Sequence, residues 1–272
     1  MTRIAVVGGG RIGEALIAGL LEAGRANKDL VVVETAPARA EQLAERFGVR
    51  VTPSVSDAVV GADLVVVAVK PGDVDAVLLD LSKADLDSGR EQVLVSLAAG
   101  VTTARLEARL PAGFPVVRVM SNTPMLVGQG MSALAPGRYA DAEQLEQVGE
   151  VLATVGKVVT VAESQMDAVT AVSGSGPAYF FLVVEAMVDA GVSLGLTRDV
   201  ATQLVVQTMI GSAALLDETG QSAVDLRAAV TSPAGTTAAA LRELERGGLR
   251  SAFLEALHAS RQRSAEQGAS NE

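Results

Sequence analysis

The sequence contains no cysteine and only one histidine, His258, among its 272 residues. The lack of cysteine excludes a disulfide framework, a thiol nucleophile and every metal or cluster site that depends on cysteine ligands. A single imidazole excludes zinc sites with several histidine ligands, and it allows Ser-His-Asp catalysis only if His258 is the base. We therefore expect no metal site.

Basic charge, aromatic side chains and long apolar runs are also scarce. The formal net charge of −10 argues against the basic surface that nucleic-acid binding requires. Aromatic residues make up 3% of the chain and apolar residues 49%, so the core must be built from aliphatic side chains. The longest apolar run, AYFFLVVEAMV, is interrupted by Glu185, and the start MTRIAVVGGG is too short and glycine-rich for a signal peptide. We therefore expect a cytoplasmic protein without membrane or nucleic-acid partners.

The first half of the chain alternates between apolar runs typical of buried parallel strands and patterns typical of helices. This alternation implies right-handed crossovers and a doubly wound α/β sheet. The expected strands are residues 3–7, 30–34, 49–51, 63–71, 92–100 and 115–120, and the expected helices are residues 12–23, 38–48, 74–81 and 103–110.

A glycine-rich loop, Gly8-x-Gly10-x-x-Gly13, directly follows the first expected strand and begins the first helix. Gly8 permits a tight turn, Gly10 lets the backbone approach a pyrophosphate, and Gly13 allows close packing of helix on sheet. The helix N-terminus, with Arg11 and Ile12, presents free N–H groups to the phosphates. The loop in this setting predicts a Rossmann-type domain with these five residues at a dinucleotide.

Glu34 ends the second strand, about where an acid binds the ribose 2′-hydroxyl of NAD in such domains. Its charge should repel a 2′-phosphate and therefore favours NADH. Arg39 is an opposing signal, because an arginine there accommodates the 2′-phosphate of NADPH. The sequence leaves NADH and NADPH both open, and a solvated strand end is the alternative for Glu34.

Two further strand ends lie where open α/β sheets bind their ligands. Lys70 lies at the carboxyl end of the fourth strand, and its position favours a cofactor contact over an ordinary strand-end charge. The small residues at the end of the next strand suit a flat nicotinamide ring. The candidate cofactor residues at these two ends are Ala68, Val69, Lys70, Pro71, Ala98 and Ala99.

From Ser164 onward the pattern predicts helices only. Two of them, within residues 165–195 and 198–220, are apolar over much of their circumference, which favours burial against a second chain. We therefore predict an α/β dinucleotide-binding domain over residues 1–163 and an all-helical dimerisation domain over residues 164–272. The polar tail RQRSAEQGASNE is expected to fray.

Three motifs accompany the glycine loop: RVMSNTPMLVGQG from Arg118, AVSGSGPAYFF from Ala171 and VTSPAGTT from Val230. In this order and spacing they resemble pyrroline-5-carboxylate reductase, whose members reduce 1-pyrroline-5-carboxylate to L-proline with NAD(P)H. The resemblance covers nearly the whole chain, and it implies a homodimer or a larger ring of dimers. This chain departs from the family pattern at Ser121, where proline is frequent, and at Ala234, where glycine is common. Alanine there matters if the position requires a positive φ.

The resemblance also implies roles for the segment VTSPAGTT, which we call the elbow. Ser232 and Gly235 would donate to the substrate carboxylate, with Thr236 beside them, and Thr237, our catalytic candidate, would hydrogen-bond near the ring nitrogen. Successive N–H groups at a turn that leads into a helix form such an anion site without an arginine. The alternative is a Ser-Pro turn with Thr236 or Thr237 capping the next helix.

The remaining site candidates flank the other two motifs. Asn122 and Thr123 are expected to contact the nicotinamide. Ser175 is expected to line the substrate pocket, although packing explains it equally well. His258 is expected to be a surface or interface residue without a catalytic part.

The shortage of acid–base groups suits an imine substrate. A protonated cyclic imine already has an electrophilic carbon, so hydride transfer needs orientation more than a protein acid, whereas a carbonyl reductase must protonate an alkoxide. A β-hydroxyacid dehydrogenase or another imine reductase is an alternative, but no lysine occurs from Ser164 onward, which counts against the hydroxyacid enzymes. A non-catalytic dinucleotide-binding module is the third hypothesis.

Overall fold

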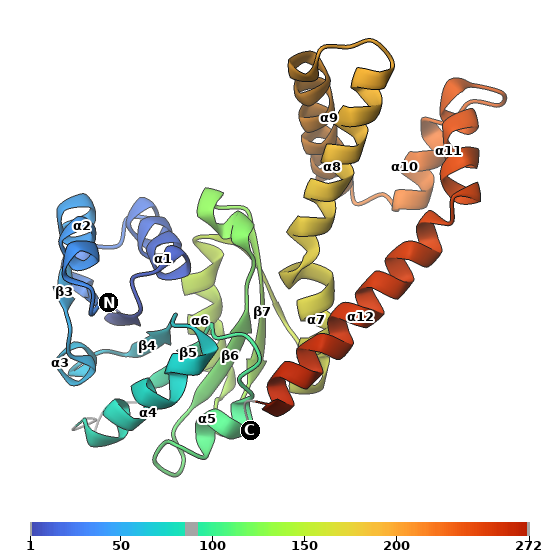
Figure 1. Ribbon diagram of the computed structural model, residues 1–272. Helices are drawn as coiled ribbons and strands as arrows, with labels where there is room; N and C mark the ends of the chain where they lie inside the picture. Colours follow the sequence, from blue (N-terminus) through green and yellow to red (C-terminus); the bar gives the residue numbers. More distant parts are fainter. Residues whose placement is uncertain (1, 85–91, 271–272) are drawn as a thin grey trace. The chain divides into compact units, whose positions relative to one another are not determined.

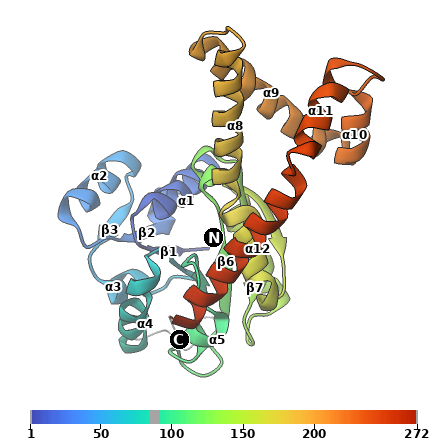
Figure 2. The same ribbon diagram turned by 45° about the vertical axis from the view of Figure 1, so that its right-hand side comes forward.

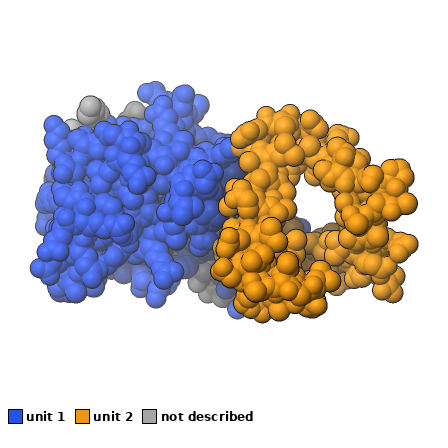
Figure 3. Space-filling model, turned by 90° about the horizontal axis from the view of Figure 1, so that it is seen from above, with its two compact units in different colours: residues 1–175, 260–272 blue, residues 176–259 orange. Residues whose placement is uncertain are grey.

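The computed structural model describes residues 2–84 and 92–270 of the chain. The chain forms two compact units, which Figure 3 colours separately. Unit 1 comprises residues 1–175 and 260–272, and unit 2 comprises residues 176–259. The domain boundary between residues 163 and 164 stays a prediction.

Unit 1 is built on an eight-stranded sheet with the order β3-β2-β1-β4-β5-β6-β7-β8 (Figure 1). Neighbouring strands are parallel except β6 and β7, which are antiparallel. The runs of valine, isoleucine and leucine make strands that are buried on both faces, as parallel sheets require. The strands are β1 (Ile4–Val7), β2 (Leu30–Val33), β3 (Arg50–Thr52), β4 (Leu64–Val67), β5 (Val93–Ser96), β6 (Val116–Met120), β7 (Gly130–Pro136) and β8 (Gly156–Thr160).

Strand β1 lies between β2 and β4, so the strand order reverses beside it. Ile4 is paired with Leu30 on one side and with Leu64 on the other. In open sheets of this kind, the carboxyl ends of the strands at such a switch point form the ligand crevice. The glycine loop follows β1 at this edge.

Helices cover both faces of the sheet. One core cluster joins the strands to α1, α2 and α6 through side chains such as Leu16, Leu43 and Leu152. The other joins them to α3, α4 and α5 through side chains such as Leu78 and Leu106. The helices of unit 1 are α1 (Arg11–Glu22), α2 (Pro37–Phe47), α3 (Val55–Val59), α4 (Val74–Lys83), α5 (Thr103–Glu107), α6 (Ala142–Ala153) and α7 (Met166–Val169).

The sequence pattern did not reveal the elements between residues 130 and 160. Strand β7, with the sequence GMSALAP, is rich in small residues of low strand propensity, although five of its seven residues are buried. Strand β8 lies at one edge of the sheet and is largely exposed, so it has no continuous apolar run. These two strands and α6 are additions to the predicted sheet.

Unit 2 consists of helices. The helices α8 (Gly176–Ser193) and α9 (Arg198–Thr219) pack on each other in both views (Figures 1 and 2). They are followed by α10 (Ala223–Ala229), α11 (Thr236–Arg246) and the first turns of α12 (Leu249–Ser270). From Ser260 onward, α12 belongs to unit 1.

The expectation that the polar tail frays is wrong for the described part of it. Helix α12 continues to Ser270, and Ser264 is 6% exposed. The Ser264 hydroxyl donates to Asp167 Oδ1 at 2.7 Å, which fixes α12 against the start of α7. Small polar residues in a polar sequence can therefore lie at a packed contact, which composition alone does not reveal. Residues 271 and 272 lie outside the described part.

Unit 2 leaves most of its large apolar side chains exposed. Among its residues, Val188 and Ala201 are the buried apolar side chains. An opening passes through unit 2 in the space-filling view (Figure 3), so its helices do not enclose a core of their own. The exposed apolar residues on α8 and α9 include Phe180, Phe181, Leu182, Met187, Leu204 and Ile210.

Two helical segments, Glu163–Ser193 and Arg198–Thr219, are long and apolar enough to cross a membrane by length and composition. The longest apolar run of the sequence, AYFFLVVEAMV, did not indicate segments of this length. A single charged residue such as Glu185 ends an uninterrupted apolar run, but it leaves the mean hydropathy of the whole helix high. Length and composition do not distinguish a membrane helix from a helix that packs against another protein chain.

Candidate active site

The glycine loop between β1 and α1 is tightly packed at Gly8 and Gly13 and open at Gly10. Gly8 has φ +109°, and a Cβ there would lie 2.7 Å from the carbonyl oxygen of Ala68. A Cβ at Gly13 would lie 2.0 Å from the oxygen of Gly8. At Gly10 a Cβ would meet nothing within 4 Å. The predicted turn and close packing are confirmed, and Gly10 leaves an open approach to the backbone.

The N-terminus of α1 lies directly behind this open position. Gly10 is the N-cap, with φ −69° and ψ −173°, and no side chain caps the helix. The first intrahelical bond, from Glu14 N–H to Gly10 O, is 2.8 Å, so the N–H groups of Arg11, Ile12 and Gly13 have no partner within the helix. Free N–H groups at the positive end of a helix bind anions. The residues present therefore fit the diphosphate of a dinucleotide.

The ends of β4 and β5 lie beside the glycine loop. The N–H of Ala68 donates to Val7 O at 2.8 Å, and the N–H of Leu97 donates to Val67 O at 2.9 Å. Ala98 is buried, and Lys70 is exposed at the start of a 3₁₀ turn over Pro71–Asp73. The structure thus brings the predicted cofactor residues of three neighbouring strands to one edge: Gly8, Gly10, Gly13, Ala68, Val69, Lys70, Pro71, Ala98 and Ala99.

Glu34 and Arg39 lie beside Gly9, the residue between Gly8 and Gly10. Glu34 accepts a hydrogen bond from Ala36 N–H at 2.9 Å, and a Cβ at Gly9 would lie 2.9 Å from Glu34 Oε2. Arg39 Nε donates to the carbonyl oxygen of Gly9 at 2.9 Å. The predicted acid and the predicted arginine therefore both lie within reach of whatever binds along this loop.

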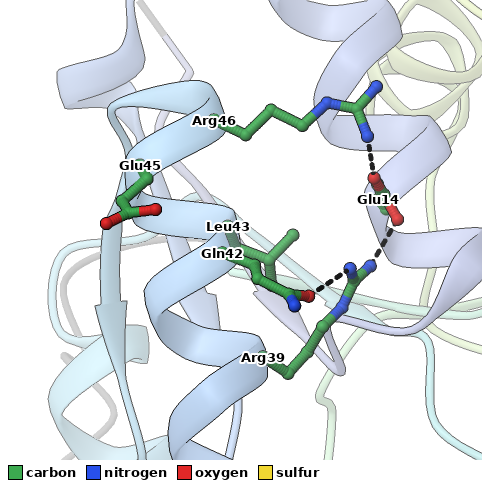
Figure 4. Close-up of a pocket in the computed structure, with 6 residues that line it drawn as sticks. All are labelled: Glu14, Arg39, Gln42, Leu43, Glu45 and Arg46. Atoms are coloured by element: carbon green, nitrogen blue, oxygen red, sulfur yellow. Dashed lines mark hydrogen bonds and ion pairs between the residues drawn. The ribbon is translucent and has the colours of Figure 1, made fainter.

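Glu14 on α1 forms ion pairs with both Arg39 and Arg46 of α2 (Figure 4). The three side chains line an open pocket of about 430 Å³ together with Gln42, Leu43 and Glu45. Sequence reasoning missed Glu14, because its only signal was its position directly after the third glycine of the fingerprint. Its carboxylate already neutralises part of the charge of Arg39.

Asn122, beyond the end of β6, has a protein partner at each end of its amide. Its Oδ1 accepts from Met131 N–H at 2.9 Å, and its Nδ2 donates to the carbonyl oxygen of Ser173 at 3.1 Å. Thr123 is exposed. Ser121, which stands where the family often has proline, shares a hydrogen bond of 3.1 Å with the hydroxyl of Ser132. The nicotinamide contacts predicted for Asn122 and Thr123 stay predictions.

The elbow, in unit 2, is a tight turn that opens α11. The N–H of Gly235 donates to Ser232 O at 3.0 Å. Gly235 is the N-cap of α11, and no side chain caps this helix either. A Cβ at Gly235 would lie 2.4 Å from Ser232 Oγ, so the hydroxyl of Ser232 lies over the start of the helix. The alternative in which Thr236 or Thr237 caps α11 through its side chain is not what the structure has.

Ala234 has φ +59°, and it is the one non-glycine residue with positive φ in the described part of the chain. Ser232, Pro233, Ala234 and Gly235 form a turn with proline second and a left-handed residue third, the pattern of a type II turn. An L-residue in this region costs about 1–2 kcal/mol relative to right-handed backbone. The departure from the double glycine of the family pattern therefore does strain the elbow.

Ser175 and His258 belong to different units. Ser175 belongs to unit 1, where its hydroxyl lies 3.3 Å from the hydroxyl of Ser260 on α12. His258 is exposed on α12 within unit 2. Among the described residues, no group of three or more histidine, aspartate or glutamate side chains is arranged to hold a metal ion.

Comparisons with known proteins connect these features to one enzyme family. The family described as "Pyrroline-5-carboxylate reductase dimerisation" matches residues 163–267, and the one described as "NADP oxidoreductase coenzyme F420-dependent" matches residues 3–100. A pyrroline-5-carboxylate reductase of Mycobacterium tuberculosis is 56% identical over 284 aligned residues, which cover 97% of this chain and 96% of that protein. The chain belongs to the pyrroline-5-carboxylate reductase family.

Other reductases of this family are similar to this chain over nearly its whole length. The enzyme of Corynebacterium melassecola is 50% identical, with 98% of this chain and 99% of that protein covered. The structure of the Coxiella burnetii reductase superposes with a TM-score of 0.94 at 37% identity, covering 98% of each chain. The structure of a Plasmodium falciparum reductase with NADP bound superposes with a TM-score of 0.85 at 28% identity, covering 98% of each chain.

These comparisons confirm several predictions from the sequence. The protein is an oxidoreductase of the pyrroline-5-carboxylate reductase family. It has an N-terminal Rossmann-type, mostly parallel sheet, followed by the helical dimerisation domain of that family. The roles of individual site residues are not tested by them.

Proposed function

We propose that the protein reduces 1-pyrroline-5-carboxylate to L-proline with a reduced nicotinamide dinucleotide, as the last step of proline biosynthesis. The observation that carries the proposal is the 56% identity to a pyrroline-5-carboxylate reductase over 97% of the chain. The glycine loop, the SGSGP motif and the elbow all lie within this span.

The dinucleotide would be held by the edge of the sheet described above. The free N–H groups at the start of α1 would bind its diphosphate, and Gly10 leaves the approach open. Ala68 to Pro71, Ala98 and Ala99 line the same edge. When bound, the reduced nicotinamide supplies the hydride.

The elbow would bind the substrate. The uncapped N–H groups at the start of α11 and the hydroxyl of Ser232 offer donors to the carboxylate. The half-buried Thr237, in the first turn of α11, would hydrogen-bond the ring nitrogen. These uncharged donors orient the substrate, and the protonated imine needs no acid from the protein for hydride addition to carbon.

For the cofactor we propose a preference for NADH. Glu34 lies beside Gly9 and would repel a 2′-phosphate. Arg39, the cation best situated to attract that phosphate, is already paired with Glu14. The reductase of Plasmodium falciparum is described with NADP bound, so the family does not exclude the phosphorylated cofactor.

We also propose that the protein is cytoplasmic and works as a homodimer, or as a ring of dimers, through its helical unit. The exposed apolar side chains of α8 and α9 are unfavourable in water unless another surface buries them. The family that matches this region is described as "Pyrroline-5-carboxylate reductase dimerisation". A second chain would supply this cover, and it explains helices of membrane-like composition in an enzyme of amino-acid synthesis.

One assay tests the proposed reaction: oxidation of NADH and of NADPH by the purified protein with 1-pyrroline-5-carboxylate. Turnover with either cofactor is the expected result. Absence of turnover with both would overturn the proposal. Turnover with a β-hydroxyacid would favour the dehydrogenase alternative, and cofactor binding without turnover of any substrate would favour a non-catalytic binding module.

A further inference from the structure

A π-helical turn at Thr170–Gly174 interrupts the helical segment between α7 and α8. The N–H of Ser175 donates to the carbonyl oxygen of Thr170, five residues earlier, at 2.8 Å. Such turns are rare in proteins overall, but many of those that occur lie at functional sites. Each one shifts the position of the residues that follow it. Here the residue that follows is Ser175, one of the predicted substrate residues.

Pro177 leaves one carbonyl of this turn without its usual helical donor. In an α-helix the carbonyl oxygen of Ser173 would accept from the N–H of residue 177, but proline has no N–H. The side-chain amide of Asn122 takes that place, with Nδ2 at 3.1 Å from Ser173 O. Asn122 thus supplies a donor to a backbone carbonyl whose partner four residues on, Pro177, has none.

The other end of the same amide fixes Asn122 to the sheet. Its Oδ1 accepts from the N–H of Met131 in β7 at 2.9 Å. The π-turn also packs directly on β6, since a Cβ at Gly174 would lie 2.3 Å from Met120 Cε. The amide therefore connects the end of β6, the start of β7 and the π-turn.

This connection lies at the edge of the sheet that carries the cofactor residues. Strand β6 is parallel to β5, so Asn122 follows the same ends of the strands as Ala98. The chain after the π-turn is held a second time, because the hydroxyl of Ser175 lies 3.3 Å from that of Ser260. The site of the amide is half-buried, so water competes weakly with these bonds.

We propose that Asn122 is a positioning residue: it sets the π-turn, and through it Ser175, against the cofactor edge of the sheet. The inference rests on the proposed function for its effect on catalysis. Asn122 acts through its hydrogen bond to the backbone of Ser173. This bond contributes more to catalysis than any hydrogen bond from Asn122 to the nicotinamide. Loss of the Nδ2 donor leaves a half-buried carbonyl without this hydrogen bond and loosens the turn.

The test compares Asn122→Asp and Asn122→Ala with wild-type protein by amide hydrogen exchange over residues 170–176, by the dissociation constant of NADH, and by steady-state kinetics. Aspartate keeps an acceptor for Met131 N–H but faces Ser173 O with a second acceptor. We expect exchange in this segment to rise about tenfold or more in both variants. We expect kcat/KM for pyrroline-5-carboxylate to fall about tenfold, with NADH affinity changed less than about twofold.

Two further variants separate the proposal from a general loss of structure. Ser173→Ala removes a hydroxyl that donates to Val169 O but keeps the carbonyl, so exchange and kinetics should stay close to wild type. Pro177→Ala, introduced into the Asn122→Ala protein, returns an N–H to the helix and should restore most of the protection.

The outcomes are distinct. Unchanged exchange with NADH binding weakened about tenfold would make Asn122 a cofactor contact and overturn the proposal. Unchanged exchange, binding and kinetics would overturn it as well. If the wild-type protein fails to reduce pyrroline-5-carboxylate, the proposed function fails, while exchange and NADH binding still decide whether Asn122 holds the π-turn.

Discussion

Glu14 and Arg39 form an ion pair between α1 and α2, beside the glycine loop (Figure 4). Glu14 also pairs with Arg46, and Arg39 also donates to Gly9 O. An arginine engaged by a carboxylate has less of its charge available for a phosphate, so we expect Glu14 to lower the affinity of this loop for a 2′-phosphate.

Glu14→Gln should therefore move cofactor preference toward NADPH. Removing the carboxylate charge frees Arg39, and we expect the ratio of NADPH to NADH affinity to rise about 3- to 10-fold, in keeping with the worth of a partly exposed ion pair. Fluorescence titration with both cofactors measures this ratio. Glu45→Gln is the matched control, because Glu45 lines the same pocket but points away from the arginines (Figure 4). An equal shift in both variants would show that net charge alone matters.

Glu34→Ala tests the acid at the end of β2. Loss of a carboxylate that binds the ribose hydroxyls should weaken NADH by about 5- to 10-fold, while NADPH should bind equally well or better. Isothermal titration with the two cofactors distinguishes these responses. An NADH dissociation constant equal to that of the wild type would show that Glu34 serves only its bond to Ala36 N–H.

Ala234→Gly should stabilise the protein. The left-handed backbone at φ +59° costs alanine about 1–2 kcal/mol, whereas glycine adopts it freely and loses about 0.5–1 kcal/mol through its more flexible unfolded chain. The net gain expected in urea unfolding is about 0.5–1 kcal/mol. In the middle of α11, by contrast, Ala240→Gly should destabilise by about 1 kcal/mol. Equal losses in the two variants would mean that the elbow carries no strain.

The sequence predicted those features that depend on local backbone chemistry. The tight turn at Gly8 and the close packing of Gly13 follow from what these glycines permit, and the structure has both. The apolar runs of β1, β2, β4, β5 and β6 predicted a buried parallel sheet, because each run is a property of consecutive residues. In each case a few consecutive residues determine the outcome.

Features that depend on distant partners were not visible in the sequence. The amide of Asn122 bridges residues 9 and 51 positions away, and Glu14 meets arginines 25 and 32 positions away. Strand β7 lacks strand-forming residues and depends on its neighbours β6 and β8. Long-range pairing of this kind leaves no periodic trace in the sequence.

Thr237→Ala tests the catalytic candidate of the elbow. Deleting one hydroxyl that binds the ring nitrogen should lower kcat/KM for pyrroline-5-carboxylate by about 10- to 100-fold, with NADH affinity nearly unchanged. Thr237→Ser keeps the hydroxyl and should recover most of the activity. Thr236→Ala removes the exposed neighbouring hydroxyl and should have a smaller effect. Kinetics equal to wild type in Thr237→Ala would assign the residue to packing alone.

Phe181→Glu tests whether the apolar face of the helical unit is covered by a second chain. Phe181, on α8, is 65% exposed within one chain. If the partner covers this side chain, burying a carboxylate there costs several kcal/mol, and the dimer should dissociate at micromolar protein concentration. Sedimentation velocity over a dilution series measures this. Leu79→Glu, at an exposed position of α4 in unit 1, introduces the same charge and should leave the assembly unchanged. Wild-type assembly in both variants would place the interface elsewhere, since a glutamate is tolerated only where water still reaches it.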